Sequence, residues 1–102
     1  MKKIIVRYKL KPGREEENLE HIEAVFRRLD TMNPEGFRYA VFRQADGVSF
    51  EHIASVETAD GSNPLAEMEE FQAFTRDIDS RCKEKPKAYV VEELGDFRMF
   101  DR

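Results

Sequence analysis

Hydrophobic and polar residues alternate most clearly between residues 37 and 57, where two short segments flank Asp46-Gly47. An Asp-Gly pair favours a tight β-hairpin, because both central residues of a type I′ turn need positive φ angles. The pattern therefore predicts two antiparallel strands joined by a two-residue loop. The cross-strand pairs are then Ala45–Val48, Arg43–Phe50, Val41–His52 and Tyr39–Ala54.

The predicted hairpin has two faces of different character, because side chains alternate across a strand. One face is apolar apart from His52 and Arg43. An apolar face of this size needs a cover, which the helices predicted on either side in the sequence would supply. This face holds Phe37, Tyr39, Val41, Val48, Phe50, His52, Ala54 and Val56.

Four more elements follow from the same kind of pattern. Alternation predicts a strand over residues 4–10 and another over residues 88–94. Apolar residues at helical spacing predict a helix over residues 14–32 and a second over residues 64–83, with Asn63 as its N-cap. The apolar stripe of the second helix comprises Leu65, Met68, Phe71, Phe74, Thr75, Ile78 and Cys82.

The order strand, helix, strand, strand, helix, strand is that of ferredoxin-like βαββαβ folds. We expect an α+β fold in which a four-stranded antiparallel sheet carries two helices on one face, as a single domain over residues 1–102. The other sheet face would expose a contiguous apolar patch, which usually marks a partner surface. A homodimer would cover it through Ile5, Arg7, Arg38, Phe42, Glu51, Ile53, Tyr89 and Val91.

Composition narrows the possible partners. The net charge is −4, with 17 basic and 21 acidic residues, which argues against a nucleic-acid-binding protein. The longest apolar stretches fall far short of the roughly 20 residues that span a bilayer. Arg7 and Lys9 interrupt the first apolar segment, so it does not resemble a signal peptide. The single cysteine allows no internal disulfide, which favours a cytoplasmic location.

His52 is the candidate functional residue, since it is the polar group on an otherwise apolar strand face. On a functional interpretation, His52 near Tyr8 or Tyr39 bonds a phenol, quinone or enol, or transfers a proton. On a structural interpretation, it is a core histidine satisfied by Tyr8, a backbone carbonyl or water. Thr75 either points into a pocket or bonds back to its own helix.

Other reactive residue types give no second candidate. His21 falls at the edge of the first helix's apolar stripe beside acidic residues, so we expect it at the surface. A metal site needs three or four converging ligands, and two histidines with one cysteine at unrelated positions predict none. Cys82 has the character of a small buried hydrophobic residue. We expect neither a metal nor a cofactor.

Three segments resemble the dimeric α/β-barrel superfamily, which includes proteins like the antibiotic biosynthesis monooxygenases and the stress-responsive A/B-barrel proteins. They are LKPG at residues 10–13, FEHIASVET at residues 50–58 and NPLAEMEEFQAF at residues 63–74. The resemblance implies a dimer whose sheets close a barrel, with any ligand pocket between sheet and helices in each subunit. The pocket residues would be Val6, Tyr8, Phe26, Tyr39, His52, Phe71, Phe74 and Thr75.

The resemblance carries His52 over, because many A/B-barrel members have a histidine at this point of the third strand. Other functional residues of the superfamily are missing. Haem-degrading members have an asparagine where this chain has Val6, and they use a tryptophan, which this chain lacks. Cyclase-like members have a His-Pro-x-x-His run in the second helix, whereas residues 67–71 contain no histidine.

Two hypotheses from different classes follow. The first is a cofactor-independent, monooxygenase-like or isomerase-like enzyme that acts on a small aromatic or quinone-type molecule, with His52 and Tyr8 as candidate catalytic residues. The second is a non-catalytic dimer that binds a small hydrophobic ligand or has a filled core. A cavity beside His52 would separate them, because solid packing of Phe26, Phe71 and Phe74 onto His52 leaves no room for a substrate.

Overall fold

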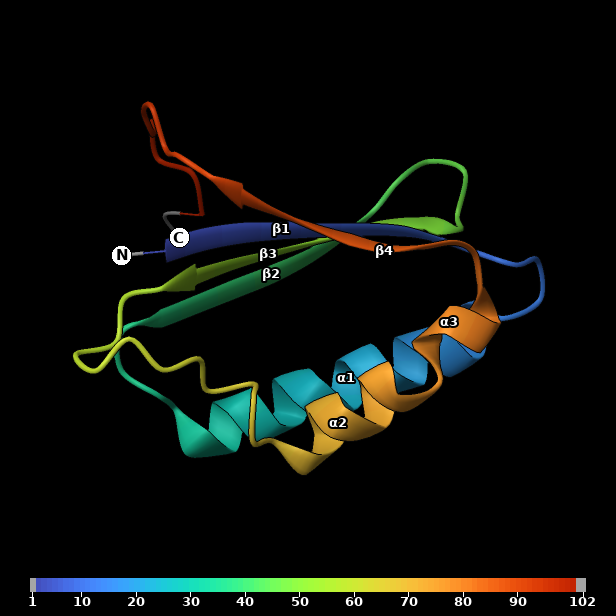
Figure 1. The fold of residues 1–102 in the computed structure, drawn as a ribbon, viewed down its shortest axis with the longest axis horizontal. Coiled ribbons are helices and arrows are strands. Elements are labelled where there is room, and N and C mark those ends of the chain that lie inside the picture. The colour runs from blue at the N-terminus through green and yellow to red at the C-terminus, as the bar shows by residue number, and fades with distance from the viewer. Residues whose placement is uncertain (1, 101–102) are drawn as a thin grey trace.

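A computed structural model describes residues 2–100 of the chain. Its strands form one antiparallel sheet in the order β2-β3-β1-β4, and all helices lie on one side of that sheet (Figure 1). This arrangement confirms the predicted α+β class and ferredoxin-like order. The strands are β1 (Lys2–Leu10), β2 (Phe37–Arg43), β3 (Ser49–Val56) and β4 (Cys82–Val91), and the helices are α1 (Glu15–Met32), α2 (Glu69–Arg76) and α3 (Ile78–Arg81).

The β2–β3 hairpin has the predicted register but a wider loop. The Gly47 N–H donates to the Gln44 carbonyl at 3.0 Å, and the Gln44 N–H donates to the Ser49 carbonyl at 2.8 Å. The Asp46 carboxylate stabilises the loop by accepting the Ser49 N–H at 2.8 Å. Compared with the predicted two-residue loop, the observed loop has one more residue on each side, so the pairing register of the strands is unchanged. The pairs Arg43–Phe50, Val41–His52 and Tyr39–Ala54 are present, whereas Ala45 and Val48 lie in the loop.

Gly36 joins α1 to β2 where the chain leaving β3 passes closely. Its φ angle is 72°, and a Cβ atom there would lie 2.6 Å from the carbonyl oxygen of Glu57. The Glu57 N–H donates to the Gly36 carbonyl at 2.6 Å. Positive φ and close approach both require glycine at this position.

The second helical region differs from the predicted single helix over residues 64–83. Residues 64–67 form turns, with the Asn63 side chain accepting the Leu65 N–H at 2.9 Å. The helix is interrupted at Asp77, which has φ −121° and ψ 22°, and it resumes as α3. Cys82 was predicted on the helix stripe but pairs with Leu10 at the start of β4. Apolar spacing alone did not separate turns from helix, because buried Leu65 and Met68 fit both.

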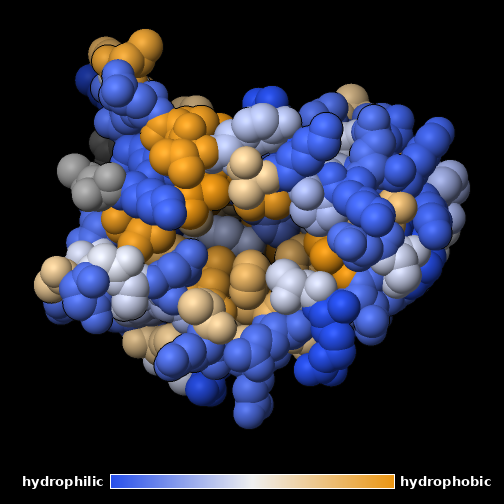
Figure 2. Space-filling view, viewed as in Figure 1, coloured by the Kyte–Doolittle hydropathy of each residue, from blue (hydrophilic) through white to orange (hydrophobic). Residues whose placement is uncertain are grey.

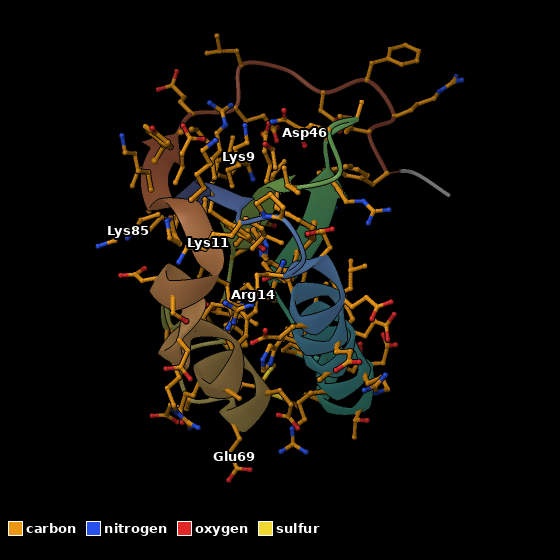
Figure 3. The ribbon with its side chains drawn as sticks, turned by 90° about the vertical axis from the view of Figure 1, so that its right-hand side faces the viewer. Lys9, Lys11, Arg14, Asp46, Glu69 and Lys85 are labelled. Carbon is orange, nitrogen blue, oxygen red and sulfur yellow. The ribbon has the colours of Figure 1, made fainter. Side chains whose placement is uncertain are left out.

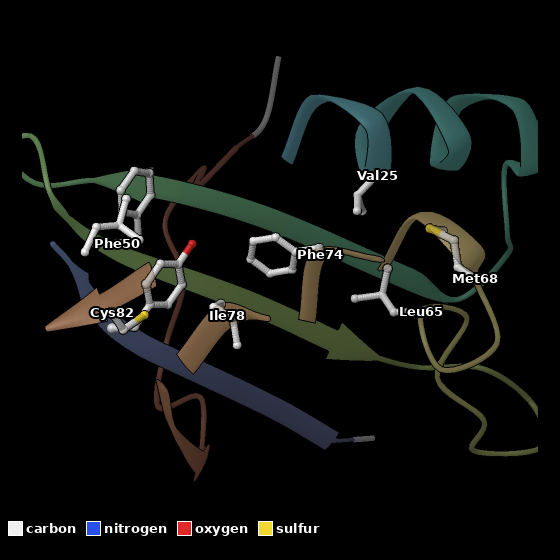
Figure 4. Packing of buried hydrophobic residues seen from close by; sticks show 9 residues of the cluster. Val25, Phe50, Leu65, Met68, Phe74, Ile78 and Cys82 are labelled. Atoms are coloured by element: carbon white, nitrogen blue, oxygen red, sulfur yellow. The ribbon is translucent and has the colours of Figure 1, made fainter. Parts of the chain in front are cut away.

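Helices α1 and α2 lie side by side beneath the sheet (Figures 1 and 3). The hydrophobic core fills the space between this helical layer and the sheet (Figure 4). No helix within residues 2–100 combines the length and the apolar character needed to cross a membrane. The buried core residues are Tyr8, Leu10, Val25, Phe50, Leu65, Met68, Phe74, Ile78 and Cys82.

No helix within residues 2–100 covers the opposite side of the sheet, which we call the open sheet face (Figure 1). On this face Phe42 and Tyr89 are 41% and 45% exposed, and Arg7 pairs with Glu51 at 3.4 Å. The segment after β4 bends over this face, where Phe100 stacks on Phe42 with ring centroids 5.8 Å apart. Exposed hydrophobic side chains therefore gather on one face and on the segment beside it.

Candidate functional site

His52 occupies the middle of β3, the central strand between β2 and β1. It pairs with Val41 on one side and with Val6 on the other, and its side chain points from the sheet toward the helices. Only 5% of its surface is exposed. The alternation that makes SFEHIASV a strand thus also buries the imidazole on the apolar face.

Two tyrosines bond the two nitrogens of the His52 ring. The Tyr8 hydroxyl lies 2.7 Å from Nε2, and the Tyr39 hydroxyl lies 2.6 Å from Nδ1. Each tyrosine is two residues from the direct cross-strand partner of His52, so it is a diagonal neighbour on the same face. Long side chains at such diagonal positions reach each other, which is why the sheet brings these three residues together.

Asn18 of α1 extends this hydrogen-bonded chain. Its Nδ2 donates to the Tyr8 hydroxyl at 2.9 Å, and the side chain is fully buried. Its Oδ1 has no hydrogen-bond partner among the described residues. Asn18 lies at helical spacing from Ile22, Val25 and Leu29 and so belongs to the apolar stripe of α1. A polar residue on this stripe could have identified Asn18 as part of the site from the sequence, but it was not among the predicted site residues.

Burial sets the protonation states of the three ring groups. It lowers the pKa of His52 to about 4, because the imidazolium would lose its hydration. The same effect raises the pKa values of Tyr8 and Tyr39 above those of ordinary tyrosines. All three groups are therefore neutral near pH 7, so they act through hydrogen bonds rather than through charge.

A cavity of about 240 Å³ lies between the sheet and α2, beside this hydrogen-bonded chain. Figure 2 shows a hollow with hydrophobic side chains at its base, between the sheet above and the helices below. The cavity leaves room for a ligand, even though Phe74 stacks on His52 with ring centroids 5.4 Å apart. Its lining comprises Ile4, Val6, Tyr8, Tyr39, His52, Ala54, Asn63, Leu65, Phe71, Phe74, Thr75, Ile78 and Pro86.

Seven of the eight predicted pocket residues line this cavity, and Phe26 does not. Phe26 packs against the Tyr39 ring with centroids 5.4 Å apart, and it lines a separate groove at the β2 side of the sheet. Thr75 lines the cavity but is exposed, and its hydroxyl donates to the Phe71 carbonyl at 3.0 Å. Bonding back to its own helix was one of the two alternatives for Thr75.

Arg81 supports the helical wall of the cavity. Its side chain is 1% exposed, and Nη2 donates to the Phe74 carbonyl at 2.6 Å. Its guanidinium carbon lies 5.5 Å from the centroid of the Phe74 ring. These contacts fix the helix end that presents Phe74 to His52. This role could not be predicted from the residue pattern, since arginine is rarely buried.

The remaining chemistry-bearing residues do not join this site. His21 is partly exposed on α1, and its ring centroid lies 6.2 Å from that of Phe74. Cys82 is buried in the core, and burial raises the pKa of its thiol. Among residues 2–100, no three His, Cys, Asp or Glu side chains converge as a metal site.

Comparison with known protein families and with curated proteins gives no match. Several solved structures share the fold. An antibiotic biosynthesis monooxygenase aligns with a TM-score of 0.72 and 14% identity, over 93% of this chain and 100% of its own. A Nitrosomonas europaea protein named for the same activity aligns with a TM-score of 0.74 and 16% identity, over 91% and 89% of the two chains.

A Pseudomonas aeruginosa protein aligns equally well, with a TM-score of 0.72 and 17% identity, over 92% of this chain and 94% of its own. At such low identities the likeness shows a shared fold and nothing about the side chains of the site. These alignments cover almost the whole of each protein, so the fold is shared without large insertions. The chain therefore has the fold of the antibiotic biosynthesis monooxygenase-like proteins, the superfamily that its sequence motifs resemble.

Proposed function

We propose that the protein binds a small, uncharged aromatic or quinone-type molecule in the cavity beside His52 and acts on it as a monooxygenase-like or isomerase-like enzyme. The observation that carries this proposal is the contact between an apolar cavity and a buried chain of neutral hydrogen-bonding groups. Apolar pockets with a few convergent polar groups are typical small-molecule sites. Neither a metal nor an organic cofactor is part of the proposal.

The lining defines the ligand class. Within residues 2–100, the cavity wall consists of hydrophobic side chains and neutral polar groups, so an ionic ligand would lose its hydration without a compensating partner. A cavity of roughly 150 Å³ holds benzene, and this one measures about 240 Å³. A molecule with one or two fused rings therefore fits best.

The tyrosine hydroxyls are the groups that would contact a ligand oxygen, because both imidazole nitrogens are already bonded. His52 would then act through Tyr39 or Tyr8 by accepting or returning a proton along a hydrogen bond. In a monooxygenase-like reaction a phenol, or the enol of an aromatic ketone, would itself supply the electrons: one oxygen atom of O₂ would become a ring carbonyl, and the other would leave as water with the two displaced hydrogens. In an isomerase-like reaction the site would stabilise an enol oxygen.

The second candidate is a non-catalytic binding protein. The same pair of hydrogen bonds supports it, since an imidazole with two protein partners has no free nitrogen to take a substrate proton. The two candidates share the ligand site and differ in turnover alone.

Titration calorimetry with naphthalene and with 1-naphthoate tests the site. Naphthalene should bind, and 1-naphthoate, which has the same rings and a carboxylate, should not. Ala54→Leu places a larger side chain in the cavity and should abolish binding, whereas Ala66→Leu in an exposed loop should not. Equal binding of both compounds, or binding unaffected by Ala54→Leu, would reject this cavity as the site.

Turnover is tested with two further compounds in air. An isomerase-like enzyme should exchange the hydrogens beside the carbonyl of 1-tetralone for deuterium in D₂O, as followed by NMR. A monooxygenase-like enzyme should consume O₂ with 1-naphthol. Binding with neither reaction would favour the non-catalytic candidate.

We also propose that the protein is a homodimer joined through the open sheet face. The apolar residues Phe42, Ile53 and Tyr89 lie on this face. The segment after β4, which lies beside it, carries further hydrophobic side chains that are exposed to solvent. A two-fold axis would bring the same patch of both subunits together. The cavity lies on the opposite side of the sheet, so dimer formation would leave its mouth free.

A further inference from the structure

The hydrogen-bonded chain that ends at Tyr39 has a direction. The amide nitrogen of Asn18 is a donor only, so the Tyr8 oxygen accepts its hydrogen. Within residues 2–100 the Tyr8 hydroxyl has one other hydrogen-bond partner, Nε2 of His52 at 2.7 Å, so the hydroxyl hydrogen is donated there. A neutral imidazole that accepts at Nε2 carries its hydrogen on Nδ1. Nδ1 therefore donates to the Tyr39 oxygen, 2.6 Å away.

Tyr39 is left with an unused hydrogen-bond donor. Its oxygen already accepts from His52, and within residues 2–100 no other protein group bonds this hydroxyl. Tyr39 lines the cavity, whose wall around it is largely apolar. Tyr39 is partly buried, and a donor that faces a largely apolar wall without a partner is unfavourable, so the site gains most from a ligand that offers an acceptor.

We propose that Asn18 is a positioning residue that fixes this direction, so that Tyr39 donates to the ligand and the site selects an aromatic ketone or quinone over a phenol. This inference rests on the proposed function. A carbonyl oxygen accepts the Tyr39 hydrogen and has no donor of its own to satisfy. A phenol of the same size also accepts it, but its own hydrogen then faces apolar walls.

The tautomer of His52 is the first test, and it needs no ligand. Long-range ¹H–¹⁵N NMR correlation of the imidazole distinguishes hydrogen on Nδ1 from hydrogen on Nε2, with His21→Gln to identify the signals of His52. The expected form near pH 7 carries hydrogen on Nδ1. A wild-type protein with hydrogen on Nε2 would overturn the inference.

Substitution of Asn18 tests its role directly. Asn18→Leu removes both polar groups, so both tautomers should be populated. Glu23→Gln, at an exposed position on the same helix, should keep the wild-type tautomer. An unchanged tautomer in Asn18→Leu would show that Asn18 only packs.

Ligand selectivity is the second test, with 1-tetralone, 1-naphthol and naphthalene as probes of similar size. Wild-type protein should bind 1-tetralone about tenfold more tightly than 1-naphthol, which corresponds to one hydrogen bond. Tyr39→Phe should remove this preference and leave naphthalene binding unchanged. Tighter binding of 1-naphthol would overturn the inference with the binding function intact, whereas failure of all three to bind would overturn the proposed function itself.

Discussion

Tyr8 and His52 lie on adjacent strands, two positions out of direct register, and their side chains bond at 2.7 Å in a buried environment. Tyr8 also accepts the hydrogen of Asn18, whereas Tyr39 bonds His52 alone. Loss of either hydroxyl would leave buried groups without partners, but the number of such groups differs. The two tyrosines are therefore not equivalent.

Tyr8→Phe should lower the free energy of unfolding by about 2 kcal/mol and Tyr39→Phe by about 1 kcal/mol. Tyr8→Phe removes a partner from both Asn18 and His52, and Tyr39→Phe removes a partner from His52 only. Urea denaturation of the two variants and the wild type measures the difference. Equal losses in the two variants would contradict the hydrogen-bonded order described above.

The low pKa of His52 makes stability depend on pH. The unfolded chain takes up a proton on this imidazole below about pH 6.5, while burial keeps the folded form neutral until about pH 4. The folded state has the lower pKa, so the free energy of unfolding falls as pH falls. Between pH 7 and pH 5 the loss should be about 2 kcal/mol.

Urea denaturation at several pH values between 5 and 7 measures this loss. His52→Gln keeps a neutral side chain that both donates and accepts but does not titrate, so most of the pH slope should disappear. His21→Gln alters the other histidine and should retain the slope. A slope that survives His52→Gln would assign the effect to other groups.

Gly36→Ala should lower the free energy of unfolding by about 3 kcal/mol. An alanine at this position would have to keep a positive φ angle, and its methyl group would lie 2.6 Å from the Glu57 carbonyl oxygen. Gly13→Ala is the matched control, because Gly13 has φ 89° but open space around its Cβ position. That control should cost about 1 kcal/mol. Thermal and urea unfolding of both variants compare the two costs, and equal losses would show that the chain relaxes around residue 36.

Ile53→Asp should disrupt the proposed dimer. Ile53 pairs with Ile5 and Ala40 on the open sheet face, so a carboxylate there would be buried without a partner between two subunits. Sedimentation equilibrium should show a dissociation constant at least about 100-fold higher than that of the wild type. His52→Ala, on the helical side, should leave the dissociation constant unchanged. A dimer that tolerates Ile53→Asp would place the interface elsewhere.

The sequence alone determined three of the four strands and the assignment of their faces, whereas β4 begins at Cys82 and ends at Val91 instead of spanning the predicted residues 88–94. Alternation with a period of two predicted which residues of the β2–β3 hairpin face the helices, and the position of Asp46-Gly47 predicted the pairing register of its two strands. The facing residues and the register are both as predicted although the loop is longer, because adding one residue to each side of the loop does not shift the pairing. The order of the elements then left few topologies other than the observed one.

Tertiary structure alone decided the partners of His52 and the space beside it. Asn18, Tyr8 and Tyr39 come from three separate elements, and their hydrogen bonds depend on side-chain distances that no local pattern encodes. The extent of α2 also depended on packing, since Leu65 and Met68 are buried by turns as readily as by a helix. A periodic pattern determines which way a residue faces, because backbone geometry is local. A cavity depends on how side chains distant in the sequence fill the volume between two layers, so only the folded chain reveals it.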